Sequence, residues 1–464
     1  MTVTAELSAF VAGLQIEALP PEVVARTRLL VLDLVGNAVR ARQDAESTPA
    51  LLAAVRALGM ARGEARVFAD TEGYSPAGAA LVNATLGHSL DFDDTHAEAV
   101  LHPGAPVIPA ALAAAEMVGA SGAEVMAGIV AGYEVALRLA LALPAGAHYD
   151  RGFHPSATCG AFGAAAAAAR VMRLDADTVA SALGIALSQC AGSLQFLANG
   201  AWTKRFQVGW AGMAGLTAAT LAREGFKGAA EAVEGKHGFL NAYAPAPRAE
   251  RVLWDLGEVY ELMATGVKPY PSCRWGHAGI DAALALREEL GLRAEEIEGA
   301  TLGLSRAGLL LVGEPAARKA DPRNVVDAQF SGPFVIACAL ATGRMDWDSY
   351  RLLDDAGIRR LLPRIGCAHD EEIEAEFPVN MAGKLTLRAR GQTFVRTVVV
   401  PKGEPANFPD EAELRAKFAG LADAVLGAGP AAALAEEVLR LDRLNDAAGL
   451  LRRSAPAGGR SEAA

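Results

Sequence analysis

Apolar residues recur at intervals of three and four along most of the chain up to about residue 265. This spacing predicts helices, because such positions fall on one helix face. The segments that show it are 23–40, 107–119, 124–143, 156–172, 176–191, 209–224 and 228–234. Ser75-Pro76 adds an N-cap and a first-turn proline for a helix that runs toward His88. The N-terminal part is therefore expected to be all-helical.

The pattern changes after Tyr270. The segments 297–304, 371–377, 384–390 and 393–400 read as strands, and the last two flank Gly391-Gln392 as a hairpin. Helical stretches at 332–341 and 348–359 lie between the strands, and helices resume at 411–418 and 430–440. We therefore expect a mainly α protein with a second domain. Residues 1–267, completed by 402–452, would form a large all-helical domain from both chain ends, residues 268–401 a smaller α+β lid domain, and residues 453–464 a disordered tail.

Length and composition narrow the class of protein. A chain of 464 residues exceeds the roughly 250–300 at which single cores stop growing, which agrees with two domains. The net charge of −11 argues against nucleic acid or an anionic membrane as partner. Five scattered cysteines without a CxxC pair argue against zinc and iron–sulfur sites and fit a reducing cytosol.

One apolar run, residues 126–147, has the length of a membrane span. Glu134 and Arg138 interrupt it and stand four apart, so we expect them to pair on one face of a soluble helix. The chain start also lacks the pattern of a signal or transit peptide. A soluble, cytoplasmic protein is predicted.

Four basic side chains stand close to predicted helix starts. His102, His154 and His277 each precede a run of small residues, and Lys204 repeats the arrangement. The first N–H groups of a helix have no partner within it, and the helix dipole adds positive charge there, so such ends attract anions. The recurrence predicts a pocket for a small molecule that carries several carboxylates.

An acidic segment, GHSLDFDDTH, precedes the first of these helices and places Asp91, Asp93 and Asp94 between two histidines. Three interpretations fit it: a solvated helix end, a metal site, or an aspartate, Asp93, that orients a histidine for proton transfer. His102 is the better catalytic candidate. His88 is interpreted as a core histidine and His96 as a rim histidine.

Six segments together resemble the MmgE/PrpD family, in the family's order and over nearly the whole chain: NATLGHSLDFDDTH, HPGAPVIPAALAAAE, GFHPSATCGAFGAAAAA, TKRFQVGWAGMAGLTAATLAREGF, KPYPSCRWGHAGIDA and DAQFSGPFVIACALATG. That family includes 2-methylcitrate dehydratase, cis-aconitate decarboxylase and iminodisuccinate epimerase. The resemblance implies a helical domain with an α+β lid, a homodimer, and chemistry without metal or organic cofactor. It also implies active-site roles for Asp93, His102, His154, Lys204 and His277.

The resemblance implies a lyase or epimerase that moves a proton beside a carboxylate of a small di- or tricarboxylic acid. We expect Lys204, Arg205, His154 and Arg274 to bind substrate carboxylates. His102, oriented by Asp93, would transfer the proton, and His277 would be the opposing acid or base.

The substrate stays open. The residues after His102-Pro103 and after Lys204-Arg205 depart from the 2-methylcitrate dehydratase pattern, which leaves decarboxylase-like and epimerase-like activities as alternatives. Two other classes also fit the residues. One is a paralogue that binds an organic acid without turnover, and the other is an all-α prenyl-diphosphate enzyme whose aspartates bind Mg²⁺.

Overall fold

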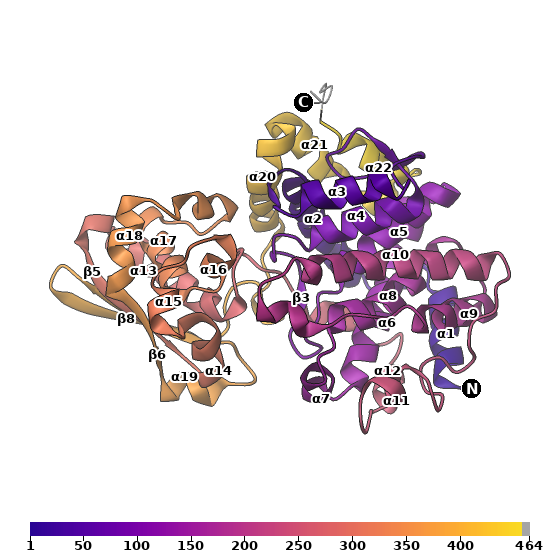
Figure 1. Ribbon diagram of the computed structural model, residues 1–464, viewed down its shortest axis with the longest axis horizontal. Helices are drawn as coiled ribbons and strands as arrows, with labels where there is room; N and C mark the ends of the chain where they lie inside the picture. The colour runs from indigo at the N-terminus through magenta and orange to yellow at the C-terminus, as the bar shows by residue number, and fades with distance from the viewer. Residues whose placement is uncertain (457–464) are drawn as a thin grey trace. The chain divides into compact units, whose positions relative to one another are not determined.

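The computed structural model describes residues 1–456 (Figure 1). The protein is mainly α and folds into two compact units: unit 1 is Met1–Gly266 together with the segment from Asp410 onward, and unit 2 is Val267–Pro409. Residues 402–409 were expected in the helical part. They belong to unit 2, because Gly403 O accepts a hydrogen bond from Val267 N (2.9 Å) and Lys402 N donates to Asp281 Oδ2 (2.7 Å).

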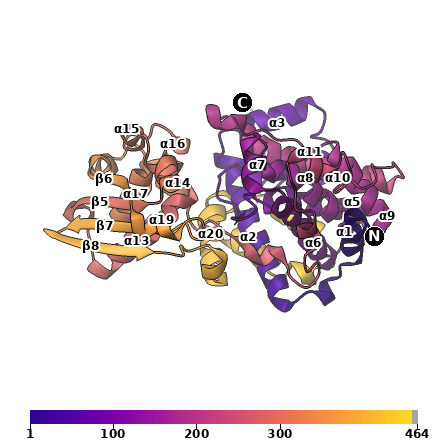
Figure 2. The same ribbon diagram turned by 90° about the horizontal axis from the view of Figure 1, so that it is seen from below.

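Unit 1 is a bundle built around α8, which contacts α5, α6, α9 and α10 (Figures 1 and 2). Its helices are α1 (Val3–Gly13), α2 (Pro21–Asp44), α3 (Thr48–Ala57), α4 (Pro76–Gly87), α5 (Gly104–Val118), α6 (Gly122–Ala142), α7 (Ala145–Asp150), α8 (Pro155–Val171), α9 (Ala176–Leu187), α10 (Thr203–Arg223), α11 (Phe239–Tyr243), α12 (Glu250–Leu253), α20 (Glu411–Leu426), α21 (Ala428–Val438) and α22 (Ala448–Arg453). Unit 1 is not purely helical, since β1 (Ala65–Arg66) pairs with β2 (Gly73–Tyr74) and β3 (Thr95–His96) with β4 (Thr265–Gly266).

The small residues of these helices let their axes approach closely. A Cβ added at Gly132 of α6 would lie 2.7 Å from the Gly163 carbonyl of α8, and one added at Gly209 of α10 would lie 2.0 Å from Thr85 Oγ1 of α4. Such distances leave no space for a side chain. Close packing of this kind fixes where the helix starts lie relative to one another.

Helix α6 is the one helix among residues 1–456 that is long and apolar enough to cross a membrane. Its apolar window is entirely buried in unit 1, as in the core helix of a soluble protein. The predicted pair is present: Arg138 Nε donates to Glu134 Oε2 at 2.9 Å, and both side chains are fully buried. Buried charges must be paired, and Arg138 also donates to the carbonyls of Trp254 and Val259.

Unit 2 contains a four-stranded sheet in the order β6-β5-β7-β8. Its elements are α13 (His277–Leu290), β5 (Ile297–Leu304), α14 (Arg306–Gly308), α15 (Ala316–Lys319), α16 (Val325–Gln329), α17 (Gly332–Thr342), α18 (Ala356–Leu361), β6 (Ile365–His369), α19 (Glu371–Glu376), β7 (Gly383–Ala389) and β8 (Gln392–Val398). Strands β5 and β6 are parallel and the other pairs antiparallel. Helix α13 packs on β7 and β8, and α17 packs on α13 and β6 (Figure 2).

Several predicted elements of unit 2 were wrong in type or position. Residues 371–377 form helix α19 instead of a strand, because Asp370 caps the amides of Glu372 and Ile373 and the first turn is acidic. The strand lies just before it, as β6. The hairpin turn is Arg390-Gly391, both with positive φ, rather than Gly391-Gln392. The expected helix at 348–359 is split into a 3₁₀ segment (Trp347–Leu352) and α18.

Two predictions in unit 1 were also wrong. Residues 228–234 form turns and irregular backbone rather than a helix, because Glu231 has a φ of +51°, which a right-handed helix cannot contain. The expected disordered tail begins too early: Arg453 ends α22, and Ser454 is buried and accepts a hydrogen bond from Ala69 N. The rest of the predicted tail, residues 457–464, lies outside the described residues.

Candidate active site

Three of the four predicted helix starts converge within unit 1. His102 stands two residues before α5, His154 is the N-cap of α8, and Lys204 is the second residue of α10. The Ser156 hydroxyl in the first turn of α8 accepts a hydrogen bond from His102 N at 3.0 Å. This bond ties the start of α5 to the start of α8, so His102 and His154 are held on neighbouring helix ends.

Asp93 is the centre of the cluster. Its Oδ2 accepts a hydrogen bond from His88 Nδ1 at 2.8 Å, and His102 Nδ1 lies 3.3 Å from the same oxygen. The His88 ring lies edge-on to His102, with centroids 4.6 Å apart, and its centroid is 6.3 Å from that of His154. His88 and Asp93 are fully buried, whereas the His102 side chain keeps 14 % of its exposure. His102 is therefore the member of this group that a substrate can reach.

Burial and charge set the protonation of this group. Burial lowers the pKa of His102 to about 4 although the Asp93 charge opposes the shift, so this imidazole is neutral near pH 7. Burial alone would raise the pKa of Asp93, but the two histidines outweigh it and hold that pKa well below the usual range. An ionised carboxylate beside a neutral, accessible imidazole is the arrangement that general acid–base catalysis needs.

The pKa of Asp94 is shifted in the opposite direction to that of Asp93. Asp94 accepts hydrogen bonds from Tyr133 O–H (2.6 Å) and from the backbone N–H of Gly104 (3.1 Å), the first residue of α5. Burial raises the pKa of Asp94 well above its ordinary value. Asp94 therefore fixes the entry of α5, and with it the position of His102, rather than supplying a charge to the site.

Lys204 forms an ion pair with the acidic segment. Its Nζ donates to Asp91 Oδ1 at 2.6 Å, and both side chains are partly exposed. Burial alone would lower the pKa of Lys204, but Asp91 outweighs it and raises the pKa, so the ammonium stays charged. The next residue, Arg205, donates to Ser47 Oγ at 3.2 Å.

His154 is oriented by Gln207, which lies one turn after Lys204 on α10. The Gln207 amide nitrogen donates to Ser193 O (2.9 Å), which turns its carbonyl oxygen toward His154 Nδ1 at 3.0 Å. That oxygen can only accept, so Nδ1 carries the proton and Nε2 keeps a lone pair. Burial, reinforced by His88 and Lys204, holds the pKa of His154 well below its ordinary value.

The cluster includes a possible donor set for a metal. One ligand atom each from His88, Asp93 and His102 lie within 4.8 Å of one another. His88 Nδ1 and Asp93 Oδ2 already bind each other, however, so a metal held through these two atoms would have to break that hydrogen bond. The geometry fits a hydrogen-bonded histidine–aspartate pair better than the metal interpretation of the acidic segment.

The remaining two predicted site residues lie in unit 2. His277 is the first residue of α13 and is buried, with Nε2 3.2 Å from Ser272 O and its ring 5.3 Å from that of Tyr270. Arg274 forms an ion pair with Glu404. All of these contacts are with residues of unit 2. The catalytic role of His277 and the binding role of Arg274 stay predictions.

Two residues of the cluster were missed from the sequence. His88 was interpreted as a core histidine, and it is buried, but it is also the strongest partner of Asp93. Its place in GHSLDFDD, five residues before Asp93, was the available signal. No sequence pattern indicated the role of Gln207, because that role depends on the packing of α10 against α8. His96, expected at a rim, is buried, and its Nδ1 accepts from Ala99 N.

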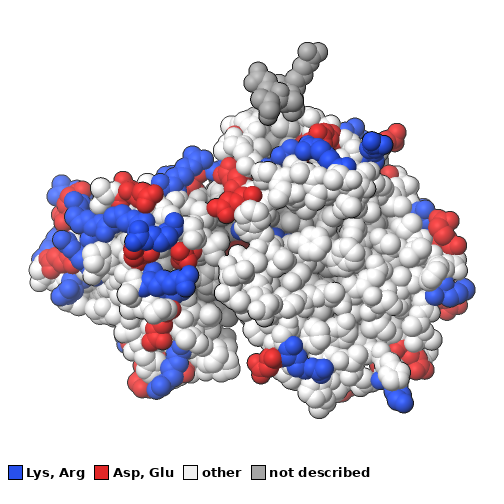
Figure 3. Space-filling view, viewed as in Figure 1, with Lys and Arg blue, Asp and Glu red and all other residues white. Residues whose placement is uncertain are grey.

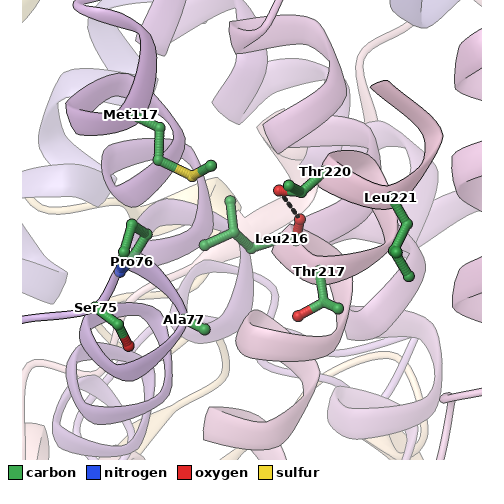
Figure 4. Close-up of a pocket in the computed structure, with 8 residues that line it drawn as sticks. All are labelled: Ser75, Pro76, Ala77, Met117, Leu216, Thr217, Thr220 and Leu221. Atoms are coloured by element: carbon green, nitrogen blue, oxygen red, sulfur yellow. Dashed lines mark hydrogen bonds between the residues drawn. The ribbon is translucent and has the colours of Figure 1, made fainter. Parts of the chain in front are cut away.

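A groove of about 280 Å³ lies elsewhere in unit 1, between α4, α5 and α10 (Figure 4). Its lining is apolar apart from hydroxyls, and those of Thr217 and Thr220 bond to carbonyls of their own helix. None of the cluster residues lines it, and it offers no charge to an acid. We therefore place the active site at the histidine cluster rather than in this groove.

Two family models match the chain. The MmgE/PrpD N-terminal domain matches residues 5–251, and the MmgE/PrpD C-terminal domain matches residues 270–443. The chain therefore belongs to the MmgE/PrpD family and is a lyase-type enzyme.

Three similar proteins have cis-aconitate decarboxylase in their names. The chain is 27 % identical to the cis-aconitate decarboxylase-like protein oryM of Aspergillus oryzae, over 97 % of this chain and 96 % of the relative. It is 26 % identical to cis-aconitate decarboxylase of Aspergillus terreus, over 97 % and 95 % of the two chains. The mouse cis-aconitate decarboxylase is also 26 % identical, over 81 % of this chain and 78 % of the relative.

Proposed function

We propose that the protein is a cis-aconitate decarboxylase-like lyase that acts on a small tricarboxylate. The observation that carries the proposal is the convergence of His102, His154 and Lys204 around Asp93, in a chain that matches cis-aconitate decarboxylases almost end to end. A site with a charged lysine and neutral imidazoles suits a multiply anionic substrate. The match to these relatives favours decarboxylation over the 2-methylcitrate dehydration first expected.

The chemistry of cis-aconitate defines what the side chains must do. The bond between the methylene carbon and its carboxyl group breaks, and the electron pair left after CO₂ departs is shared with the far alkene carbon. That carbon must then take one proton. We assign the proton transfer to His102, with Asp93 stabilising its charged form. Lys204 and His154 bind the carboxylates that stay on the molecule, and no metal or organic cofactor is invoked.

The test is a panel of cis-aconitate, 2-methylcitrate and iminodisuccinate incubated with the protein in D₂O and followed by ¹H NMR. The proposal expects turnover of cis-aconitate, with CO₂ release and deuterium at one carbon of the product. Dehydration of 2-methylcitrate alone, or exchange on iminodisuccinate alone, would contradict it and favour another activity of the family. Binding without any product would indicate a non-catalytic paralogue, and loss of turnover on chelation would indicate a metal enzyme.

Substrate binding is expected to take up protons. In the free protein the pKa of His102 is about 4 and that of His154 is lowered, so both are neutral near pH 7. Nearby carboxylates favour the charged imidazole and raise both pKa values in the complex. The affinity must then rise as the pH falls through the raised pKa values toward about 4, because over that range the complex binds more protons than the free protein.

Calorimetry with propane-1,2,3-tricarboxylate, the saturated analogue, measures this uptake when it is repeated in two buffers of different ionisation enthalpy. The analogue binds the same carboxylate sites but has no alkene carbon to accept the proton. Proton release, or an affinity that falls on acidification, would show that the imidazoles do not face the ligand.

We also propose that the protein forms a homodimer through the outer face of α10. Between Arg205 and Arg223 this helix has no charged residue, and Phe206 (45 %) and Leu221 (38 %) are exposed on it. A broad area of unit 1 is free of Lys, Arg, Asp and Glu in Figure 3. An uncharged face suits a second copy of itself.

Sedimentation should give twice the 48.0 kDa of one chain, and Leu221→Glu should give single chains. A wild-type monomer at micromolar concentration would contradict the proposal.

A further inference from the structure

The acidic segment is held from behind by side chains that the proposed chemistry does not use. Phe92, between Asp91 and Asp93, is buried, and its carbonyl oxygen accepts hydrogen bonds from Lys417 Nζ (2.7 Å) and Asn37 Nδ2 (3.2 Å). The Lys417 ammonium also lies 3.7 Å from the centre of the Phe92 ring. Lys417 therefore holds both the backbone and the side chain of this residue.

The Phe92 carbonyl belongs to the peptide that enters Asp93. The residue before it, Asp91, has a φ of +53°, a left-handed conformation that only surrounding contacts maintain in a non-glycine residue. The Asp91 carboxylate accepts a hydrogen bond from Lys204, and the Asp93 carboxylate contacts His88 and His102. Fixing the peptide between the two acids therefore sets how both of them point.

The groups behind this peptide come from distant parts of unit 1. Lys417 lies on α20, in the returning C-terminal segment, and also donates to Asp33 Oδ1 on α2. Asn37, one turn after Asp33, donates to the Asp33 carbonyl as well (2.9 Å). The Asn37 side-chain oxygen is buried without a hydrogen-bond partner among the described residues. Leaving a buried acceptor unpaired lowers stability. The Asn37 amide nitrogen nevertheless donates to the Phe92 carbonyl, which indicates that this contact matters for the acidic segment.

We propose that Lys417, together with Asp33 and Asn37, positions the Asp93 carboxylate against His102 and thereby controls proton transfer from the far side of the acidic segment. The proposal rests on the proposed function for its kinetic consequence. Lys417 touches no substrate in this account and acts only through Phe92 and Asp93. The C-terminal segment thus contributes to the active site without supplying a catalytic residue.

The test compares two charge pairs that both join α2 to the C-terminal segment. Asp33→Asn/Lys417→Met removes the pair behind the acidic segment without leaving a buried charge unpaired. Arg28→Met/Asp442→Asn is the matched control, because Arg28 binds Asp442 through two hydrogen bonds of 2.8 Å that do not involve the acidic segment. Lys417→Arg keeps the charge and should retain activity.

We expect Asp33→Asn/Lys417→Met to lower kcat on cis-aconitate by about 10- to 100-fold, with KM changed by less than about threefold, because misplacement of a catalytic group by about 1 Å is enough for such a loss. The control pair should change kcat little at a similar thermal midpoint. Equal losses in both double variants would overturn the proposal, because the effect would then be general destabilisation.

A second readout does not depend on the substrate. In protein labelled with ¹⁵N-histidine, the His88 Nδ1–H that bonds Asp93 should give a low-field proton signal, assigned by its absence in His88→Asn. We expect this signal to shift or vanish in Asp33→Asn/Lys417→Met and to persist in Arg28→Met/Asp442→Asn. An unchanged signal in the first variant overturns the proposal. If the wild-type protein turns over no acid in the panel, the proposed function fails, and this signal still decides the positioning role.

Discussion

His102→Asn is expected to lower kcat on cis-aconitate by about 10²- to 10⁴-fold, the usual contribution of a positioned general acid or base. Asparagine keeps a polar side chain of similar size beside Asp93 but cannot transfer a proton. Because Lys204 and His154 are the proposed carboxylate-binding groups, KM should change much less than kcat. Steady-state kinetics measure both quantities.

The matched control is His237→Asn, since His237 is exposed and lies outside the cluster. That variant should keep wild-type kcat and KM. Full turnover by His102→Asn, at a thermal midpoint equal to the wild type, would remove His102 from the mechanism. Attention would then move to His154, whose Nε2 keeps a lone pair.

Asp93→Asn is expected to lower kcat by about 10³-fold or more, as when a carboxylate that supports a catalytic histidine is made neutral in other enzymes. An amide carries no charge, so it cannot stabilise an imidazolium at His102. The Asp93 charge raises the pKa of His102 against the effect of burial, so its loss must lower that pKa further. The substitution should also lower the stability, because a depressed pKa means that the folded protein favours the charged Asp93. A thermal midpoint measured for Asp93→Asn shows whether the variant is folded at the assay temperature.

An NMR titration of the histidine signals separates this effect from misfolding. We expect the His102 resonance to titrate at lower pH in Asp93→Asn than in the wild type. Asp442→Asn is the control: Asp442 binds Arg28 rather than a histidine, so the His102 titration should change little. Equal shifts in the two variants would contradict a specific Asp93–His102 interaction.

The sequence predicted the helices of unit 1 well where periodicity and caps agree. Ser75 caps α4 as expected, accepting from Gly78 N, and α6, α8 and α9 lie within a few residues of their predicted ranges. The failures have local causes. The cap formed by Asp370 makes a helix of residues 371–376, where the alternation of apolar residues had indicated a strand. The positive φ of Glu231 interrupts the predicted helix at 228–234.

The sequence predicted the site residues that stand at helix starts. His102, His154 and Lys204 were recognised because each stands at the N-terminus of a helix, and unit 1 brings these three together. The roles of Gln207 and Lys417 could not be read in advance. Both depend on packing between helices far apart in the chain, α10 on α8 and α20 on α2, and no local pattern encodes such a contact.

The most direct test of the central claim is a crystal structure of His102→Asn with bound cis-aconitate, since this variant should bind the acid without consuming it. The account predicts one carboxylate within hydrogen-bond distance of Lys204 Nζ, another at His154, and the alkene carbon facing Asn at position 102. A molecule bound elsewhere, or a histidine cluster left empty at saturating cis-aconitate, would contradict it.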